Sequence, residues 1–198
     1  ILTAFAMIAS CDNIIAGCYM AAMRLDIPSM IVTGGSMQPG QYCGKTVVEA
    51  DLDAARFSGA SEEELMDMED NVCPSFGACP SMGTANTMQM LGEVLNLVLP
   101  GTSTIPASDN AKLRKAREAG MYMVEMAKAG RKPSDLITKE VLMNASCLTW
   151  QWQALPMQCY IFYLTHMNSV SSLHWKILRN TQKKFHVLTR LFQAVHIQ

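Results

Sequence analysis

Two short segments of this chain carry residue types that could bind a metal. Cys11 and Asp12 are adjacent, at the point where an apolar run gives way to a helical pattern. A thiolate is a soft ligand suited to the iron of iron–sulfur clusters, and a carboxylate is a hard ligand suited to Mg²⁺. Two simpler alternatives are that Cys11 is a small buried apolar residue and that Asp12 only caps a helix.

The second segment, residues 73–88, holds two more cysteines in a loop that glycine and proline interrupt. Cys73 and Cys79 do not have the C-x-x-C spacing that is typical of a zinc ribbon. Cys79 comes shortly before a predicted helix, whose first backbone N–H groups can stabilise the negative charge of a thiolate or a cluster sulfide. The spacing leaves an alternative open, in which the loop is structural and both cysteines are incidental.

The pattern around these segments predicts an α/β fold with a parallel or mixed sheet flanked by helices. Residues 1–9 form an apolar run of strand length, helical spacing of apolar residues continues to about Leu25, and residues 30–33 form a β-branched run closed by Gly34-Gly35. A strand–helix–strand order predicts parallel strands. Ligands bind at the carboxyl edge of such sheets, which is where the Cys-Asp pair would lie.

Further helices are predicted along the chain, whereas residues 36–60 are expected to be mostly loop. Ser61 and Glu64 form a capping box that starts a helix ending near Asp70. Three more helices are expected from near Thr84 to Pro100-Gly101, from Ser108-Asp109 to Gly130, and from Ser134-Asp135 to about Ala145. The first of these three is expected to bury Met88, Leu91, Leu95 and Val98, and the second Leu113, Ala116, Gly120, Met123 and Ala127.

Composition restricts the classes of function. The chain has 198 residues, of which 49% are hydrophobic and 17% charged, and this indicates a folded domain rather than a disordered chain. Its net charge of -1 argues against a nucleic-acid partner. No apolar run reaches the roughly 18 residues that a membrane span needs, so no membrane partner is expected. The cysteine pattern favours a reducing compartment, which is the cytoplasm, or the stroma or matrix of an organelle in a eukaryote.

Residues 146–198 differ sharply in composition from residues 1–145. All 17 acidic residues and all 12 glycines lie in the first part, whereas all 4 histidines and all 3 tryptophans lie in the second. A native domain needs glycine for its turns and acidic residues for its solvated faces. The second part is therefore predicted to be a tail that forms no domain. A basic amphipathic appendage for a membrane or a partner is the alternative.

The chain resembles the dihydroxy-acid and sugar-acid dehydratases, which are iron–sulfur lyases. The resemblance covers residues 1 to about 145, so that this part is expected to be a partial N-terminal dehydratase domain. The segments that carry it are Cys11-Asp12, Ile31 to Gly35, Cys73 to Met88, and Leu99 to Ala107. The Thr-Ala-Asn-Thr-Met ending of the third segment looks more like the dihydroxy-acid branch. A sugar-acid dehydratase, acting on aldonate or phosphogluconate, is the alternative.

This resemblance implies the elimination of water from a small 2,3-dihydroxy acid, which gives a 2-keto acid for branched-chain amino acid biosynthesis. Cys11 and Cys79 match ligands of the family's iron–sulfur cluster, of 2Fe-2S or 4Fe-4S type, whereas Cys73 matches a motif position that is not a ligand. Asp12 matches a Mg²⁺ ligand. Asn13 replaces the family's carbamylated lysine and could offer Mg²⁺ only a neutral carbonyl oxygen.

The resemblance also implies that part of the site lies outside this chain. A third cluster cysteine and a further acidic ligand are expected upstream of Ile1, and the serine base is expected in a C-terminal domain. The chain is therefore predicted to hold no catalytic residue and to be inactive alone, as a fragment of a homodimeric parent. A non-enzymatic α/β binding module is the alternative from another class.

A shifted reading frame would explain the unusual composition of residues 146–198. When codons for Met157 to Ile161 are read one base earlier, they encode Ala, Val or Met, Leu, and then His or Tyr. This agrees with the family's continuation, which ends roughly in Asn-Thr-Val-Leu-His. We therefore expect a frameshift near residues 145–148, followed by an out-of-frame tail.

Overall fold

The computed structural model describes residues 3–151, except for the side chains of Asp12 and residues 149–151. Its central layer is a pair of parallel strands, β1 (Phe5–Ala9) and β2 (Ser29–Thr33), which helix α1 (Asp12–Leu25) connects. The register pairs Ala9 with Thr33, so both strands end at the same edge. The predicted strand–helix–strand unit with parallel pairing is confirmed.

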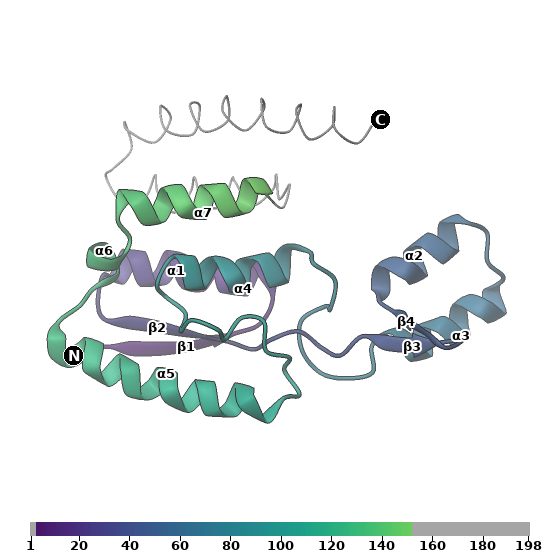
Figure 1. Ribbon diagram of the computed structural model, residues 1–198, viewed down its shortest axis with the longest axis horizontal. Coiled ribbons are helices and arrows are strands. Elements are labelled where there is room, and N and C mark those ends of the chain that lie inside the picture. Colours follow the sequence, from purple (N-terminus) through teal and green to yellow (C-terminus); the bar gives the residue numbers. More distant parts are fainter. Residues whose placement is uncertain (1–2, 152–198) are drawn as a thin grey trace, which may run out of the picture.

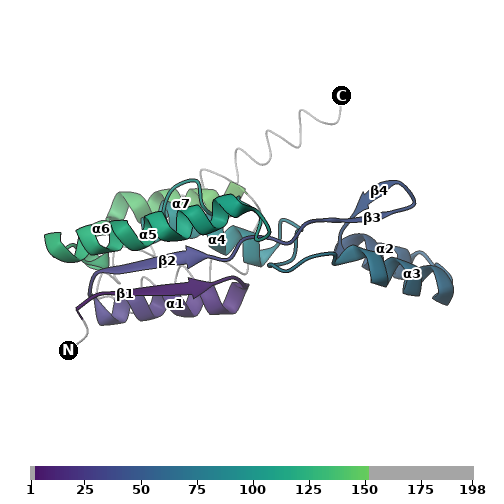
Figure 2. The ribbon, with the colours of Figure 1, turned by 90° about the horizontal axis from the view of Figure 1, so that it is seen from below.

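Helices cover both faces of this strand pair, as the two ribbon views show (Figures 1 and 2). Helices α1 and α4 (Thr84–Val94) lie on one face with α7 (Lys139–Gln151) beyond them, and α5 (Asn110–Ala129) lies on the other. The side of α1 and α4 holds the larger core, in which Ile15, Tyr19, Ile31, Met88 and Leu91 are fully buried. A second cluster lies under α5 and contains Met30, Val32, Leu99, Ala119 and Met126. The predicted α/β fold with flanking helices is confirmed.

The prediction that residues 36–60 are mostly loop is wrong. They contain an antiparallel hairpin of β3 (Gly40–Tyr42) and β4 (Lys45–Val47), followed by helix α2 (Glu49–Phe57). The turn residues Cys43 and Gly44 both have positive φ, at 48° and 75°, as a two-residue hairpin of type I′ requires. Cysteine is an uncommon residue for that turn, and strands of three residues are too short to show alternation.

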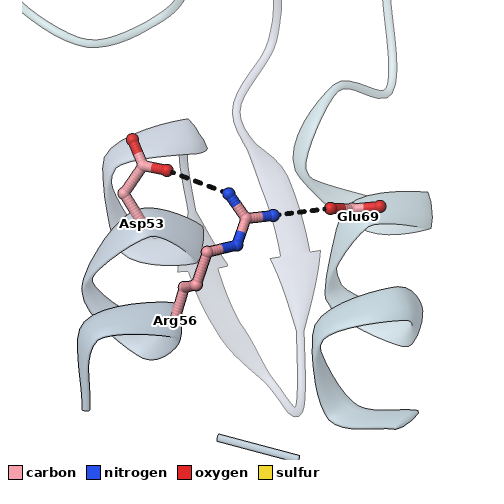
Figure 3. Close-up of polar contacts among 3 residues, drawn as sticks. All are labelled: Asp53, Arg56 and Glu69. Atoms are coloured by element: carbon pink, nitrogen blue, oxygen red, sulfur yellow. Dashed lines mark hydrogen bonds and ion pairs between the residues drawn. The ribbon is translucent and has the colours of Figure 1, made fainter. Parts of the chain in front are cut away.

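The hairpin, α2 and α3 (Glu62–Val72) form a small lobe that projects from the main layers (Figure 1). Arg56 of α2 links the two helices of this lobe, with a nitrogen 2.8 Å from Glu69 and another 3.6 Å from Asp53 (Figure 3). The predicted capping box of α3 is confirmed. The Ser61 hydroxyl accepts a hydrogen bond from the Glu64 N–H at 3.2 Å, and the Glu64 carboxylate accepts one from the Ser61 N–H at 3.0 Å.

Helix α4 ends at Val94 and not at Pro100, so the prediction that Val98 lies on a helix is wrong. After a turn, the chain runs beside β2, where Ile31 forms a parallel bridge with Val98 and its N–H donates to the Leu97 carbonyl at 2.8 Å. Val98 is buried, as expected, but in an extended segment. Leu95 and Val98 are three residues apart, which is a spacing typical of one helix face, and this is why the sequence predicted a longer helix.

The buried stripe of α5 agrees with the prediction at Ala116 and Met123, whereas the other buried positions lie one residue earlier than predicted. Leu113, expected to be buried, is 72% exposed. The residues that face the sheet are buried or half-buried and alternate in steps of four and three; they are Lys112, Ala116, Ala119, Met123 and Met126. A lysine begins this stripe, which is why hydrophobic periodicity alone does not find it.

The last predicted helix is divided in two by the structure. Helix α6 (Pro133–Leu136) precedes α7, and α7 continues beyond the predicted end near residue 145 to Gln151. Ala145 is fully buried in the larger core. Residues 152–198, most of the predicted tail, lie outside the described residues, so the division of the chain after residue 145 stays a prediction. Within residues 3–151, no helix combines the length and the apolar character needed to cross a membrane.

We expect Ser61→Ala to lower the free energy of unfolding by about 1 kcal/mol, because it leaves the Glu64 N–H at the start of α3 without its capping oxygen. Arg56→Gln is the control within the same lobe, since its exposed ion pairs contribute roughly 0.2–1 kcal/mol. Urea denaturation of both variants measures the difference. A larger loss for Arg56→Gln would contradict this ranking.

Candidate functional site

The carboxyl edge of β1 and β2 brings together the two cysteines that sequence reasoning selected. Cys11 lies two residues after the end of β1, is exposed, and is the N-cap residue of α1. The loop that carries Cys79 runs back to the end of β2, where the Ala78 N–H donates to the Gly35 carbonyl at 2.9 Å. Hydrogen bonds of Gln89 to the Ser10 carbonyl and to Asn86, and of Asn86 to the Cys79 carbonyl, bring the two cysteines to this edge. Their role as cluster ligands stays a prediction.

Burial is the main cause that raises the pKa of the half-buried Cys79 thiol. The carboxylate of Glu49 and the charge of Cys11 raise this pKa further, whereas the hydroxyl of Ser81 lowers it. The stabilisation of a thiolate or cluster sulfide by the helix start after this loop stays a prediction. A bound metal cation would reverse this balance, because a thiol must lose its proton to become a ligand.

Glu49, the first residue of α2, is a residue of this site that sequence reasoning missed. One of its carboxylate oxygens, Oε1, accepts a hydrogen bond from the Ser81 hydroxyl at 2.6 Å. The other, Oε2, is buried and has no hydrogen-bond partner among the described residues. A buried carboxylate oxygen without a partner is uncommon and suits a site that receives a further donor or a cation. The only sequence signal was the acid-rich start of α2, which the loop prediction obscured.

Two side-chain amides of α4 connect the segments of the site, and we call Asn86 and Gln89 the amide relay. Asn86 Nδ2 donates to the carbonyl oxygens of Cys79 at 3.0 Å and Ser81 at 2.7 Å. Gln89 Nε2 donates to the Ser10 carbonyl at 3.3 Å and to Asn86 Oδ1 at 3.4 Å. Gln89 Oε1 accepts the Gly35 N–H at 2.9 Å. The relay therefore joins three loops at one edge of the sheet.

The turn after β2 is packed too tightly for side chains. Gly35 has φ of +87°, and a Cβ atom there would lie 2.8 Å from the Ala107 nitrogen and closer still to the Ile105 carbonyl oxygen. A Cβ atom at Gly34 would collide with the Ser10 hydroxyl. Glycine is required here both for its backbone conformation and for the close approach of the neighbouring chain.

Lys112 lies beneath this turn and is another residue that sequence reasoning missed. Its side chain is buried, and Nζ donates to the Thr102 carbonyl at 2.5 Å and to the Thr33 hydroxyl at 3.4 Å. Burial lowers its pKa to about 8, although the charge of Glu93 acts in the opposite direction. Lys112 thus connects the end of β2 to the loop over residues 99–107, two of the segments that carry the family resemblance.

The remaining predicted site residues form no recognisable metal site. Asp12 is the first residue of α1, and its side chain lies outside the described part of the chain. Asn13 is exposed, and so is Cys73 at the end of α3. Among the described residues, no group of three or more His, Cys, Asp or Glu side chains could hold a metal ion. The assignment of Asp12 and Asn13 to Mg²⁺ stays a prediction.

The sequence is clearly related to known proteins. Residues 1–152 match the profile of the dihydroxy-acid/6-phosphogluconate dehydratase N-terminal family. The chain belongs to this dehydratase family. The resemblance drawn from Cys11-Asp12 and the Cys73 to Met88 run is thereby confirmed, and the converging loops described above belong to a dehydratase N-terminal domain.

Several curated relatives are named dihydroxy-acid dehydratase. The chain is 43% identical over 144 residues to the one from Clostridium pasteurianum, which covers 70% of the chain and 50% of that protein. It is 45% identical over 147 residues to the one from Caldanaerobacter subterraneus subsp. tengcongensis, and 44% identical over 144 residues to the one from Pyrococcus abyssi. These alignments cover 72% and 70% of the chain, but only 26% of each relative. The chain thus spans half or less of the length of these dehydratases.

We expect Gly35→Ala to destabilise this dehydratase domain by about 2–4 kcal/mol, because the new Cβ atom would meet backbone atoms at a positive φ. Gly120→Ala is the control, since nothing lies within 4 Å of a Cβ atom there and alanine favours the interior of α5 by roughly 0.5–1 kcal/mol. Thermal and urea unfolding measure both effects. Equal stability of the two variants would show that the turn is not constrained.

The stability of the protein should depend on pH through Lys112. Its pKa in the folded chain is about 8, below the usual 10.5, so between these values the unfolded chain binds more protons. The free energy of unfolding of the wild type, minus that of Lys112→Met, should therefore rise as the pH increases from 8 to 10.5. Urea denaturation at several pH values measures this difference. A difference that stays constant, or falls, over this range would contradict the burial of a lysine charge.

Proposed function

We propose that this chain is part of an iron–sulfur hydro-lyase that converts a small 2,3-dihydroxy carboxylic acid into a 2-keto acid and water. The observation that carries the proposal is the position of Cys11 and Cys79 at the same carboxyl edge of β1 and β2, where hydrogen bonds of Gln89 and Asn86 link their backbones. The family description includes 6-phosphogluconate dehydratases, but the curated relatives cited above carry the dihydroxy-acid name. This favours a branched-chain dihydroxy acid over a sugar acid, and an enzyme over a non-enzymatic module.

The described residues fit an iron–sulfur cluster as a partial set of ligands. Cys11 and Cys79 would supply two soft sulfur ligands, for either a 2Fe-2S or a 4Fe-4S cluster. The buried Glu49 oxygen, which has no hydrogen-bond partner among the described residues, is consistent with a cation or a hydrogen-bond donor beside Cys79. When bound, such a cluster supplies a Lewis-acidic iron that polarises the hydroxyl group leaving from C3.

The chain's own residues would hold this centre in place and leave it accessible. Glu49 and Ser81 fix the Cys79 side of the site through their short hydrogen bond. The absence of side chains at Gly34 and Gly35 lets the loop over residues 105–107 approach the edge closely. Cys11 is exposed, which leaves one side of the site open to a small substrate.

The described residues fit Mg²⁺ less well than they fit an iron–sulfur cluster. Asn13 is neutral and exposed, and the described side chains provide no cluster of carboxylates around it. We therefore derive no step through Mg²⁺. The base that removes the C2 proton is also not assigned to this chain, in keeping with an inactive fragment of a larger cytoplasmic or organellar homodimer.

The proposal includes a division of the chain into a dehydratase domain, residues 1–145, and an out-of-frame tail, residues 146–198. Two observations support it: the alignments to the relatives cited above cover only 70% to 72% of the chain, and acidic residues and glycine are absent from the second part. The family profile itself extends to residue 152. Sequencing the coding DNA tests the division. An intact frame without the family's peptide one base away would refute it.

Anaerobic incubation of the full chain with ferrous iron and sulfide tests the cluster assignment. We expect visible absorption and bound iron that decrease strongly in Cys11→Ser and in Cys79→Ser, because each variant removes one of two sulfur ligands. Cys73→Ser is the matched control, since it changes a cysteine of the same loop that is exposed at the end of α3. Equal iron binding by all three variants would refute the assignment.

The substrate class is tested on the full-length parent enzyme, because this chain spans only part of its relatives. Turnover of a branched 2,3-dihydroxy acid is expected to exceed turnover of an aldonic acid under the same conditions. A preference for the aldonic acid would assign the chain to the sugar-acid branch instead.

A further inference from the structure

Gln89 of α4 is a polar residue at a position that faces the core, where an apolar residue would be expected. Its side chain is fully buried, although a glutamine in the core must satisfy two N–H donors and a carbonyl acceptor. It does so through three different parts of the chain. The carbonyl oxygen accepts the Gly35 N–H at 2.9 Å, and the amide nitrogen donates to the Ser10 carbonyl at 3.3 Å and to Asn86 Oδ1 at 3.4 Å.

These contacts lead from one cysteine of the site to the other. Ser10 immediately precedes Cys11, and Asn86 donates its own N–H to the carbonyl oxygen of Cys79 at 3.0 Å. A continuous path of hydrogen bonds therefore runs from the backbone before Cys11, through Gln89 and Asn86, to the backbone of Cys79. Because both amides project from one helix, their separation is fixed by helical geometry.

We propose that Gln89 is a positioning residue that holds Cys11 and Cys79 in register so that both sulfur atoms can reach one shared centre. The inference rests on the proposed function, since it requires a two-thiol site. It adds to that function a residue that does not itself touch the centre. Gln89 acts through Ser10 on one side and through Asn86 on the other.

A buried hydrogen bond elsewhere on the same helix provides the comparison. Thr87 is also buried, but its hydroxyl donates to the carbonyl of Gly83, the N-cap residue of α4, at 2.8 Å. Removing the Thr87 hydroxyl removes a buried hydrogen bond at the start of α4 but leaves every hydrogen bond of the path from Ser10 through Gln89 and Asn86 to Cys79 intact. Thr87→Val is therefore the matched control for the loss of a buried polar group.

The experiment measures the proximity of the two thiols directly, without a metal. In the full chain, the other cysteines are replaced by serine, and a short bifunctional thiol reagent, dibromobimane, joins Cys11 to Cys79 and becomes fluorescent when both ends have reacted. We expect Gln89→Met to slow the cross-linking by roughly tenfold relative to the reference chain, because the severed path leaves buried polar groups unpaired and the loops free to separate. Thr87→Val should cross-link at the reference rate.

Two further measurements make the result decisive. The rates of single alkylation by monobromobimane should be unchanged, which separates thiol reactivity from thiol proximity.

Gln89→Glu keeps the acceptor for Gly35 but lacks the N–H donors toward Ser10 and Asn86, so it should slow cross-linking as well. This variant replaces Gln89→Met in the test if Gln89→Met does not fold. Cross-linking at the reference rate in the Gln89 variants would overturn the inference and leave the proposed function standing. Absence of cross-linking in the reference chain would instead overturn the two-thiol site itself.

Discussion

The hydrogen bond between the Gly35 N–H and the Gln89 side chain fixes the position of the turn after β2, and the rest of the site depends on that turn. Where parallel strands end, their backbone groups lose their partners in the sheet and need new ones if they are buried. The same glutamine also donates a hydrogen bond from Nε2 to the Ser10 carbonyl, just after β1. One side chain thus replaces the missing sheet contacts of both strands and sets the distance between the loops that follow them.

The turn is constrained from its opposite side by Lys112. A Cβ atom at Gly35 would lie 2.8 Å from Lys112 Cε, so the lysine stem packs directly against the bare backbone of the turn. Burying the lysine charge is unfavourable, as its lowered pKa shows, and the bonds to Thr102 and Thr33 offset only part of this cost. The turn therefore lies between a buried amide and a buried cation, an arrangement that leaves it little freedom to move.

The sequence alone predicts the parallel strands, α1, α3, and the two cysteines at the carboxyl edge, because these depend on local periodicity, a capping box and a specific motif. It does not predict Glu49 as a site residue, since three-residue strands and a cysteine in the hairpin turn give no recognisable pattern. Lys112 and Gln89 are not predicted from the sequence for a different reason. Both are polar residues on buried faces, and hydrophobic periodicity treats such positions as solvent-exposed.

The small lobe has a direct physical connection to the site, although it projects from the main layers (Figure 2). The start of α2 carries Glu49, whose carboxylate accepts a hydrogen bond from the hydroxyl of Ser81, two residues after Cys79, and also interacts with the Cys79 thiol. A carboxylate is costly to bury with one oxygen unsatisfied, so the lobe would gain stability from any cation or hydrogen-bond donor that reached Oε2. Occupation of the site and the attachment of the lobe are therefore thermodynamically linked, and each should favour the other.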